Sequence, residues 1–77
     1  MFNLLDTVAL TSDLPTVGLK AGDVGAVVEV LAPDAYEVEF VAASGRTQAL
    51  VTVREAQVRA LGDRDLIAVR SLTQSAA

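Results

Sequence analysis

Apolar and polar side chains alternate in several short stretches of this chain, which is the pattern of a β-strand that buries one face. Residues 36–41 give the clearest case, because Glu37 and Glu39 separate apolar side chains at intervals of two. The side chains of this strand that are predicted to point into a core are Tyr36, Val38 and Phe40. Further strands are predicted at residues 6–10, 24–31, 47–53 and 58–61.

Residues 24–31 carry many valines, and the phase of this strand decides which of them reach the core. A strict period of two places one set on the core face: Val24, Ala26, Val28 and Val30. The same period places another set on the opposite face: Val27, Glu29 and Leu31. Gly25 predicts a bulge or a sharp bend, which small barrels need at their corners. In residues 47–53 the inward set is Ala49, Val51 and Val53, whereas Leu50 faces away from the core.

Two tight turns are predicted at residues 32–35 and 42–46, because each contains a Pro or Gly of the kind that hairpins use. The longer connection, residues 11–23, also contains turn residues, but three of its side chains are apolar: Leu14, Val17 and Leu19. We expect these three side chains to cover an opening of the core, since a solvated loop has no need of them.

The C-terminal part of the chain is less regular. Thr52 and Glu55 have the spacing of a capping box, which predicts one short helical turn ending at Gln57. Residues 62–77 are predicted to form a tail, whose apolar side chains fit either an amphipathic turn or a brief strand: Leu66, Ile67, Val69 and Leu72. Residues 74–77 are expected to be frayed.

The number of strands and the length of their connections predict the fold class. Five short strands joined mostly by tight turns favour an all-β fold, a small barrel with a short C-terminal tail. Closing a barrel hides the strand edges that an open sheet would expose. The expected organisation is one domain, residues 1–61, followed by the tail, residues 62–77.

Composition narrows the range of functions. The chain has 77 residues, of which 52% are hydrophobic, and it contains neither Cys nor His. This composition excludes disulfides, thiolate metal sites, histidine bases and serine–histidine triads. We therefore expect that the protein is not an enzyme and binds no cofactor. No apolar run is long enough to span a membrane, and the N-terminus has no basic region, so we expect a cytoplasmic location without membrane contact.

Charge is distributed unevenly along the chain. Residues 1–53 carry seven acidic and two basic side chains, a net charge of −5. Residues 54–77 carry three acidic side chains and four arginines, a net charge of +1. The acidic body repels the phosphates of nucleic acids and suits a basic or partly apolar protein partner.

A series of short motifs occurs in a characteristic order: Leu4-Leu5-Asp6-Thr7-Val8-Ala9-Leu10, Asp13-Leu14-Pro15, Gly18-Leu19, Gly22-Asp23-Val24-Gly25, Val27-Val28-Glu29-Val30-Leu31 and Tyr36-Glu37-Val38-Glu39-Phe40. Over residues 3–61 the chain thereby resembles a bacterial family of small proteins classed as a domain of unknown function. The resemblance implies an SH3-like barrel and no catalytic residues. Some members are encoded beside toxin-like or mobile-element genes, which implies a partner, immunity or antitoxin-like role.

Residues 19–28 resemble the KOW-type hairpin of ribosomal and transcription-factor barrels in their Gly spacing and valine pattern. This likeness implies an alternative function, binding of nucleic acid or association with the ribosome. RNA-binding versions of the hairpin carry several basic side chains, whereas this segment has Lys20 alone. Nucleic acid is therefore not the partner that we expect.

Two sets of side chains are candidates for a partner surface. The acids Glu29, Glu37 and Glu39 form either a solvated strand face or a negative surface for a basic partner. The apolar side chains Val27, Leu31 and Leu50 are either covered by the N-terminal segment or the tail, or they contact a partner or a second copy of the chain. The sequence thus predicts a non-catalytic protein-interaction module that binds a protein partner or a second copy of the chain. The family resemblance implies that the partner is a neighbouring gene product.

Overall fold

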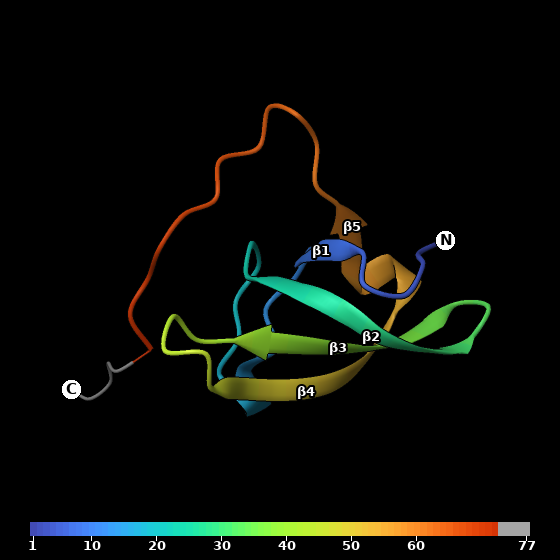
Figure 1. The fold of residues 1–77 in the computed structure, drawn as a ribbon, viewed down its shortest axis with the longest axis horizontal. Coiled ribbons are helices and arrows are strands. Elements are labelled where there is room, and N and C mark those ends of the chain that lie inside the picture. Colours follow the sequence, from blue (N-terminus) through green and yellow to red (C-terminus); the bar gives the residue numbers. More distant parts are fainter. Residues whose placement is uncertain (73–77) are drawn as a thin grey trace.

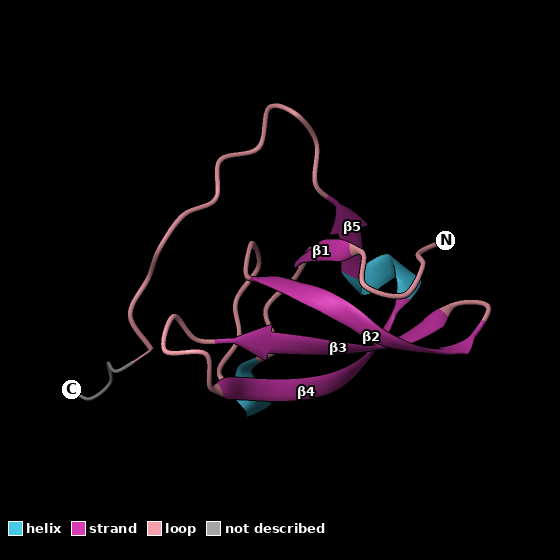
Figure 2. Ribbon diagram, viewed as in Figure 1, coloured by secondary structure: helices cyan, strands magenta, loops and turns pink. Residues whose placement is uncertain are grey.

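The computed structural model describes residues 1–72 of the chain. Five strands form one antiparallel sheet in the order β4-β3-β2-β1-β5 (Figures 1 and 2). The strands are β1 (Thr7–Leu10), β2 (Val24–Ala32), β3 (Ala35–Val41), β4 (Thr47–Arg54) and β5 (Val58–Ala60). Two single turns of 3-10 helix complete the regular structure, η1 (Pro15–Val17) and η2 (Glu55–Gln57). The predicted all-β fold with five strands and a short C-terminal tail is confirmed.

The core lies inside the curled sheet. Its buried side chains come from every strand and from the β1–β2 connection: Val8, Leu10, Leu19, Val27, Tyr36, Val38, Phe40, Val53 and Val58. Although β4 and β5 stand at opposite ends of the strand order, Val53 and Val58 belong to this one cluster. The sheet therefore bends far enough to bring its two ends onto the same core, as a barrel does.

The phase that we predicted for β2 is wrong, because the strand contains an extra residue relative to β3. Val27 is opposite Val38, but Glu29 is opposite Glu37, so Val28 has no counterpart on β3. Such a bulge reverses the alternation of side chains. Val27 is consequently in the core, fully buried, instead of on the opposite face.

A second register shift follows between Val30 and Ala32, and Val30 is 48% exposed where we predicted a core residue. No bulge lies at Gly25, which is in regular register opposite Val8. Gly25 serves a different purpose. A Cβ atom there would lie 2.7 Å from Val38 Cγ1, so its absence lets β2 and β3 approach each other at the core.

The β1–β2 connection covers the core as expected. Leu19 is buried and Leu14 packs against the cluster, whereas Val17 stays partly exposed. Leu14 and Leu19 are joined by a backbone bridge around η1, and Gly18 closes this turn with a φ of 72°. The turn places the Gly18 carbonyl oxygen at the surface, close to the start of β2.

The helical turn between β4 and β5 is confirmed, but the residues that cap it differ from the prediction. The side chain of Gln57 accepts a hydrogen bond from the Arg54 backbone N–H at 2.8 Å. Thr52 instead lies on β4 and donates its hydroxyl to Glu37. The predicted position of the turn is therefore correct, but Thr52 and Glu55 are not the residues that cap it.

In the N-terminal segment, the aromatic ring of Phe2 is the part that packs against the core. Phe2 packs edge-on against Tyr36, with 5.4 Å between ring centroids. The Tyr36 hydroxyl donates to Glu55 at 2.8 Å and accepts from the Phe2 backbone N–H at 3.1 Å. Leu4 and Leu5 remain 58% and 73% exposed, so neither covers the apolar side chains that we expected them to cover.

Residues 61–72 contain neither of the elements that we considered for the tail, since they form no helix and no strand. The chain leaves β5, arches away from the sheet and returns beside the opposite end of the domain (Figure 1). An ion pair fixes it near each end of this path, Arg59 with Asp65 and Arg70 with Asp23. The expectation of fraying at residues 74–77 concerns residues outside the described part.

Candidate functional site

Cross-strand pairing places most of the predicted partner surface on one side of the sheet. Glu29, Glu37 and Thr52 form one row across β2, β3 and β4, and Ala26, Glu39 and Leu50 form another. Because directly opposite residues share a face of the sheet, these six side chains lie together on the face that points away from the core. We call this set the outer face: Ala26, Glu29, Glu37, Glu39, Leu50 and Thr52.

The three carboxylates of the outer face have no cationic partner in the described part of the chain. Glu37 accepts a hydrogen bond from the Thr52 hydroxyl at 2.8 Å, and Glu39 accepts one from the Thr47 hydroxyl at 2.5 Å. The ion pairs of the described residues involve other acids: Asp23, Asp34, Glu55 and Asp65. The outer face is therefore negative, and the threonine hydroxyls hold two of its carboxylates in place without neutralising them.

The apolar part of the predicted surface is smaller than we expected. Leu50 is 56% exposed beside Glu39, and Leu31 is 46% exposed near the end of β2. Val27 does not belong to the surface, since it is buried in the core. What remains is one exposed leucine within a group of glutamates and a second leucine toward the β2–β3 turn.

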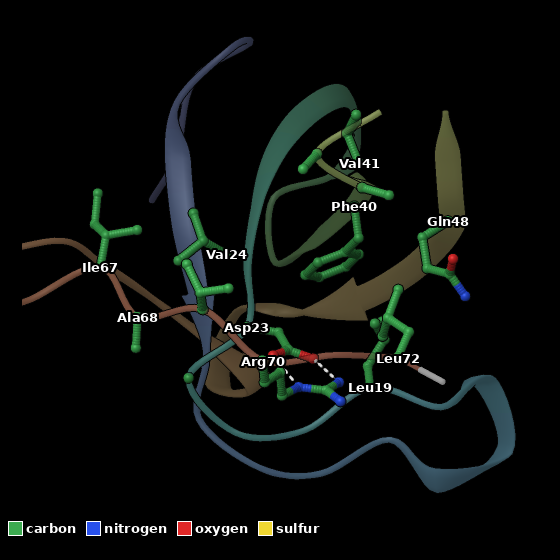
Figure 3. Close-up of a pocket in the computed structure, with 14 residues that line it drawn as sticks. Leu19, Asp23, Val24, Phe40, Val41, Gln48, Ile67, Ala68, Arg70 and Leu72 are labelled. Carbon is green, nitrogen blue, oxygen red and sulfur yellow. Dashed lines mark hydrogen bonds and ion pairs between the residues drawn. The ribbon is translucent and has the colours of Figure 1, made fainter. Parts of the chain in front are cut away.

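A groove that sequence reasoning missed lies at another part of the molecule, between the returning C-terminal segment (residues 62–72) and the sheet. Its volume is about 490 Å³. The wall on the body of the domain includes Leu19, Val24, Phe40, Val41 and Gln48, and the wall on the C-terminal segment includes Ile67, Ala68, Val69 and Leu72 (Figure 3). The groove is mainly apolar on both sides.

An arginine–carboxylate pair, Arg70 with Asp23, lines this groove (Figure 3). Arg70 donates from Nε to Asp23 Oδ1 at 2.9 Å and from Nη2 to Asp23 Oδ2 at 2.6 Å. Nη2 of Arg70 also donates to the Gly18 carbonyl oxygen at 3.1 Å. The hydrogen bonds from Arg70 hold the pKa of Asp23 below its ordinary value, although partial burial of the carboxyl opposes this effect.

Backbone hydrogen bonds within the β1–β2 connection fix the position of the Asp23 carboxylate. The Lys20 backbone N–H donates to Asp23 Oδ2 at 2.8 Å, and the Asp23 N–H donates to the Lys20 carbonyl oxygen at 3.0 Å. Gly22, between them, has a φ of 92°, which the turn requires and which glycine adopts without strain. The carboxylate is therefore held by the backbone of its own turn in addition to Arg70.

Within residues 1–72 no three acidic side chains gather as a metal site would require. None of the helical turns in that part is long and apolar enough to cross a membrane.

Comparisons with known proteins give one match. A family model with the description "Domain of unknown function (DUF4926)" matches residues 4–60. No curated protein and no solved structure matches the chain. The matched region includes all five strands and the outer face, and it ends before the C-terminal segment.

Proposed function

The chain belongs to this family of unknown function, DUF4926, and we propose that it is a non-catalytic protein-interaction module whose outer face binds a basic region of a partner protein. The observation that carries the proposal is the group of three glutamates, Glu29, Glu37 and Glu39, on one face of the sheet without a cationic partner among the described residues. Carboxylates that share a face without cations give that face a negative potential, which attracts a basic partner.

The arrangement of the outer face fits a protein surface better than a nucleic acid. Leu50 supplies an exposed apolar side chain beside the acids, and partner surfaces commonly combine an apolar centre with a charged surround. A negative face repels phosphates, which disfavours the nucleic-acid alternative suggested by the KOW-like hairpin. The threonine hydroxyls that bind Glu37 and Glu39 reduce the side-chain freedom that binding would otherwise remove.

We further propose that the fold is an SH3-like barrel of a bacterial, cytoplasmic protein. Three features support the barrel: the strand order β4-β3-β2-β1-β5, the long connection between β1 and β2, and the 3-10 turn that precedes β5. The partner most consistent with the resemblance is the product of a neighbouring gene, in a pairing of the immunity or antitoxin type. Self-association is the other arrangement that the exposed leucines allow.

The test is complex formation with the product of the neighbouring gene. Both proteins are purified and mixed, and the solution mass of the mixture is measured by light scattering. We expect a complex with the unmodified chain, and loss of that complex with the double variant Glu37→Lys/Glu39→Lys and with Leu50→Asp. Asp63→Lys is the matched control, because Asp63 is an exposed acid outside the outer face.

Two results contradict the proposal. One is a complex that survives both outer-face variants, which would place the contact elsewhere. The other is the absence of any complex together with binding of RNA or DNA at low salt, which would favour the nucleic-acid alternative. Circular dichroism of each variant verifies that the fold is retained.

A further inference from the structure

We propose that Asp23 and the Gly18 carbonyl oxygen form a guanidinium-binding site for an arginine of a partner protein, and that Arg70 of the same chain occupies this site in the absence of the partner. We call the two acceptors the guanidinium site. It lies apart from the outer face, so this inference stands or falls independently of the proposed function.

The first argument is the geometry of the site. A planar guanidinium meets a carboxylate best through two parallel N–H···O bonds, and Arg70 forms such a pair with Asp23. A third bond, to the Gly18 carbonyl oxygen, fixes the direction from which the guanidinium enters. A lysine ammonium cannot reproduce this planar arrangement, so the site is selective for arginine.

The second argument is that the site is preformed by the body of the domain. Asp23 is held by the Lys20 backbone N–H within a tight turn, and Gly18 belongs to the turn around η1. Neither acceptor depends on the C-terminal segment for its position. When Arg70 leaves, both acceptors therefore remain in place for another guanidinium, and little ordering is required for it to bind.

The third argument is that the C-terminal segment occupies the groove poorly. Leu66 is 94% exposed, Ile67 72% and Val69 97%, whereas Leu72 is 39% exposed, so most of the large apolar side chains of the segment contribute little to the groove. Space of about 490 Å³ remains between the segment and the wall that contains Phe40 and Val24. Figure 3 shows the Arg70–Asp23 contact with Phe40 and Leu72 near the same space.

These observations specify the partner. It presents an arginine flanked by apolar side chains that fill the groove better than the C-terminal segment does. Its positive charge is attracted by residues 1–53, whose net charge is −5. A second copy of this chain is a poor candidate, because an exchanged Arg70 would form the same bonds in trans at the cost of associating two molecules.

The C-terminal segment then acts as an internal competitor. A tethered Arg70 has a high effective concentration at the guanidinium site, so an external arginine must displace it. If the closed form has a population of about 90%, the apparent affinity for an external segment falls by about tenfold. Removal of Arg70 should therefore raise the apparent affinity by about this factor.

The experiment uses the full chain and a synthetic peptide as the probe. The peptide has the sequence of residues 66–72, Leu-Ile-Ala-Val-Arg-Ser-Leu, with blocked ends. It is titrated into ¹⁵N-labelled protein, and the amide shifts of Gly18, Lys20 and Asp23 are followed by NMR. The proteins are the unmodified chain, Arg70→Gln, Arg70→Gln/Asp23→Asn, and the control Arg64→Gln, which removes an exposed arginine from the same segment.

We expect the peptide to bind Arg70→Gln about tenfold more tightly than it binds the unmodified chain or Arg64→Gln. A peptide with Gln or Lys in place of its arginine should bind at least tenfold more weakly, and Arg70→Gln/Asp23→Asn should lose the interaction. Equal affinities for Arg70→Gln and the unmodified chain would overturn the inference, as would full binding of the Gln peptide.

Two further measurements make the test decisive. Light scattering of the unmodified chain should give the monomer mass, and a dimer that Arg70→Gln dissociates would show that a second copy is the occupant instead. The NMR spectrum of Arg70→Gln should keep its dispersion. Its loss would show that the C-terminal segment is a required part of the fold, which also contradicts the inference.

Discussion

Replacement of Gly25 by alanine tests how closely β2 and β3 approach in this fold. An added Cβ would lie 2.7 Å from Val38 Cγ1, 2.8 Å from the Glu39 carbonyl oxygen and 2.9 Å from Phe40 Cε2. Optimal contacts between carbon atoms are about 3.5–4.0 Å, so these atoms must retreat by roughly 0.5 Å or more. Val38 and Phe40 are buried and cannot move into solvent, and the Glu39 oxygen moves only if the two strands separate.

The magnitude follows from two opposing effects. Overpacking of a well-filled core costs about 1–3 kcal/mol. Replacing glycine by alanine recovers about 0.4–1 kcal/mol, because it restricts the unfolded chain. The difference lies between about 0 and about 2.6 kcal/mol, and its middle value is a loss of about 1.3 kcal/mol in the free energy of unfolding. For a domain of this size, each kcal/mol lowers Tm by about 4–8 °C, so at this middle value Gly25→Ala should melt about 5–10 °C lower.

The assay is thermal and urea unfolding followed by circular dichroism. Gly62→Ala is the matched control, because the nearest atom to its new Cβ, Asp65 Oδ2, lies at an ordinary 3.6 Å. This control gains the same restriction of the unfolded chain without the overpacking, so it should be about 0.4–1 kcal/mol more stable than the unmodified chain. A Gly25→Ala variant as stable as Gly62→Ala would refute the packing of β2 against β3 described above.

Two other predictions concern polar contacts. Tyr36→Phe removes the hydroxyl that donates to Glu55 and accepts from the Phe2 backbone N–H. Loss of these hydrogen bonds should lower Tm by about 4–8 °C in thermal unfolding. An unchanged Tm would contradict the hydrogen bonding described for Tyr36. Hydrogen bonds from Arg59 and from the Gly62 backbone N–H lower the pKa of Asp65 to about 2. The stability that these hydrogen bonds contribute is therefore complete at pH values above the ordinary Asp pKa of 3.8, and it is lost as the pH falls toward 2. Carboxyl NMR titration should give this midpoint, and Arg59→Gln should raise it; a midpoint near 3.8 in the unmodified chain would show that the Arg59–Asp65 pair does not form in solution.

The regular part of the fold was largely predictable because its side chains alternate. The structure agrees with the prediction for β3, whose glutamates separate Tyr36, Val38 and Phe40, and for β4, whose Val53 is buried. The phase of β2 was not predictable, because the extra residue at Val28 breaks the period of two and nothing in a run of valines marks its place.

The candidate surfaces were also only partly predictable from the sequence. Alternation predicted that Glu37 and Glu39 share a face with Glu29 on the neighbouring strand, and the strand register of the structure places the three residues on one face. Val27 was assigned to that face only because the bulge was unknown. The contact between Asp23 and Arg70 joins residues 47 positions apart through a segment without regular structure, and no periodicity reports such a contact.

Amide chemical-shift mapping of the complex with the neighbouring gene product tests the central proposal most directly. If the outer face is the contact surface, the largest shifts on binding will lie at Glu37, Glu39 and Leu50, and the core of β1 will change little. Shifts confined to β5 and the N-terminal turn, with β3 and β4 unaffected, would contradict the proposal.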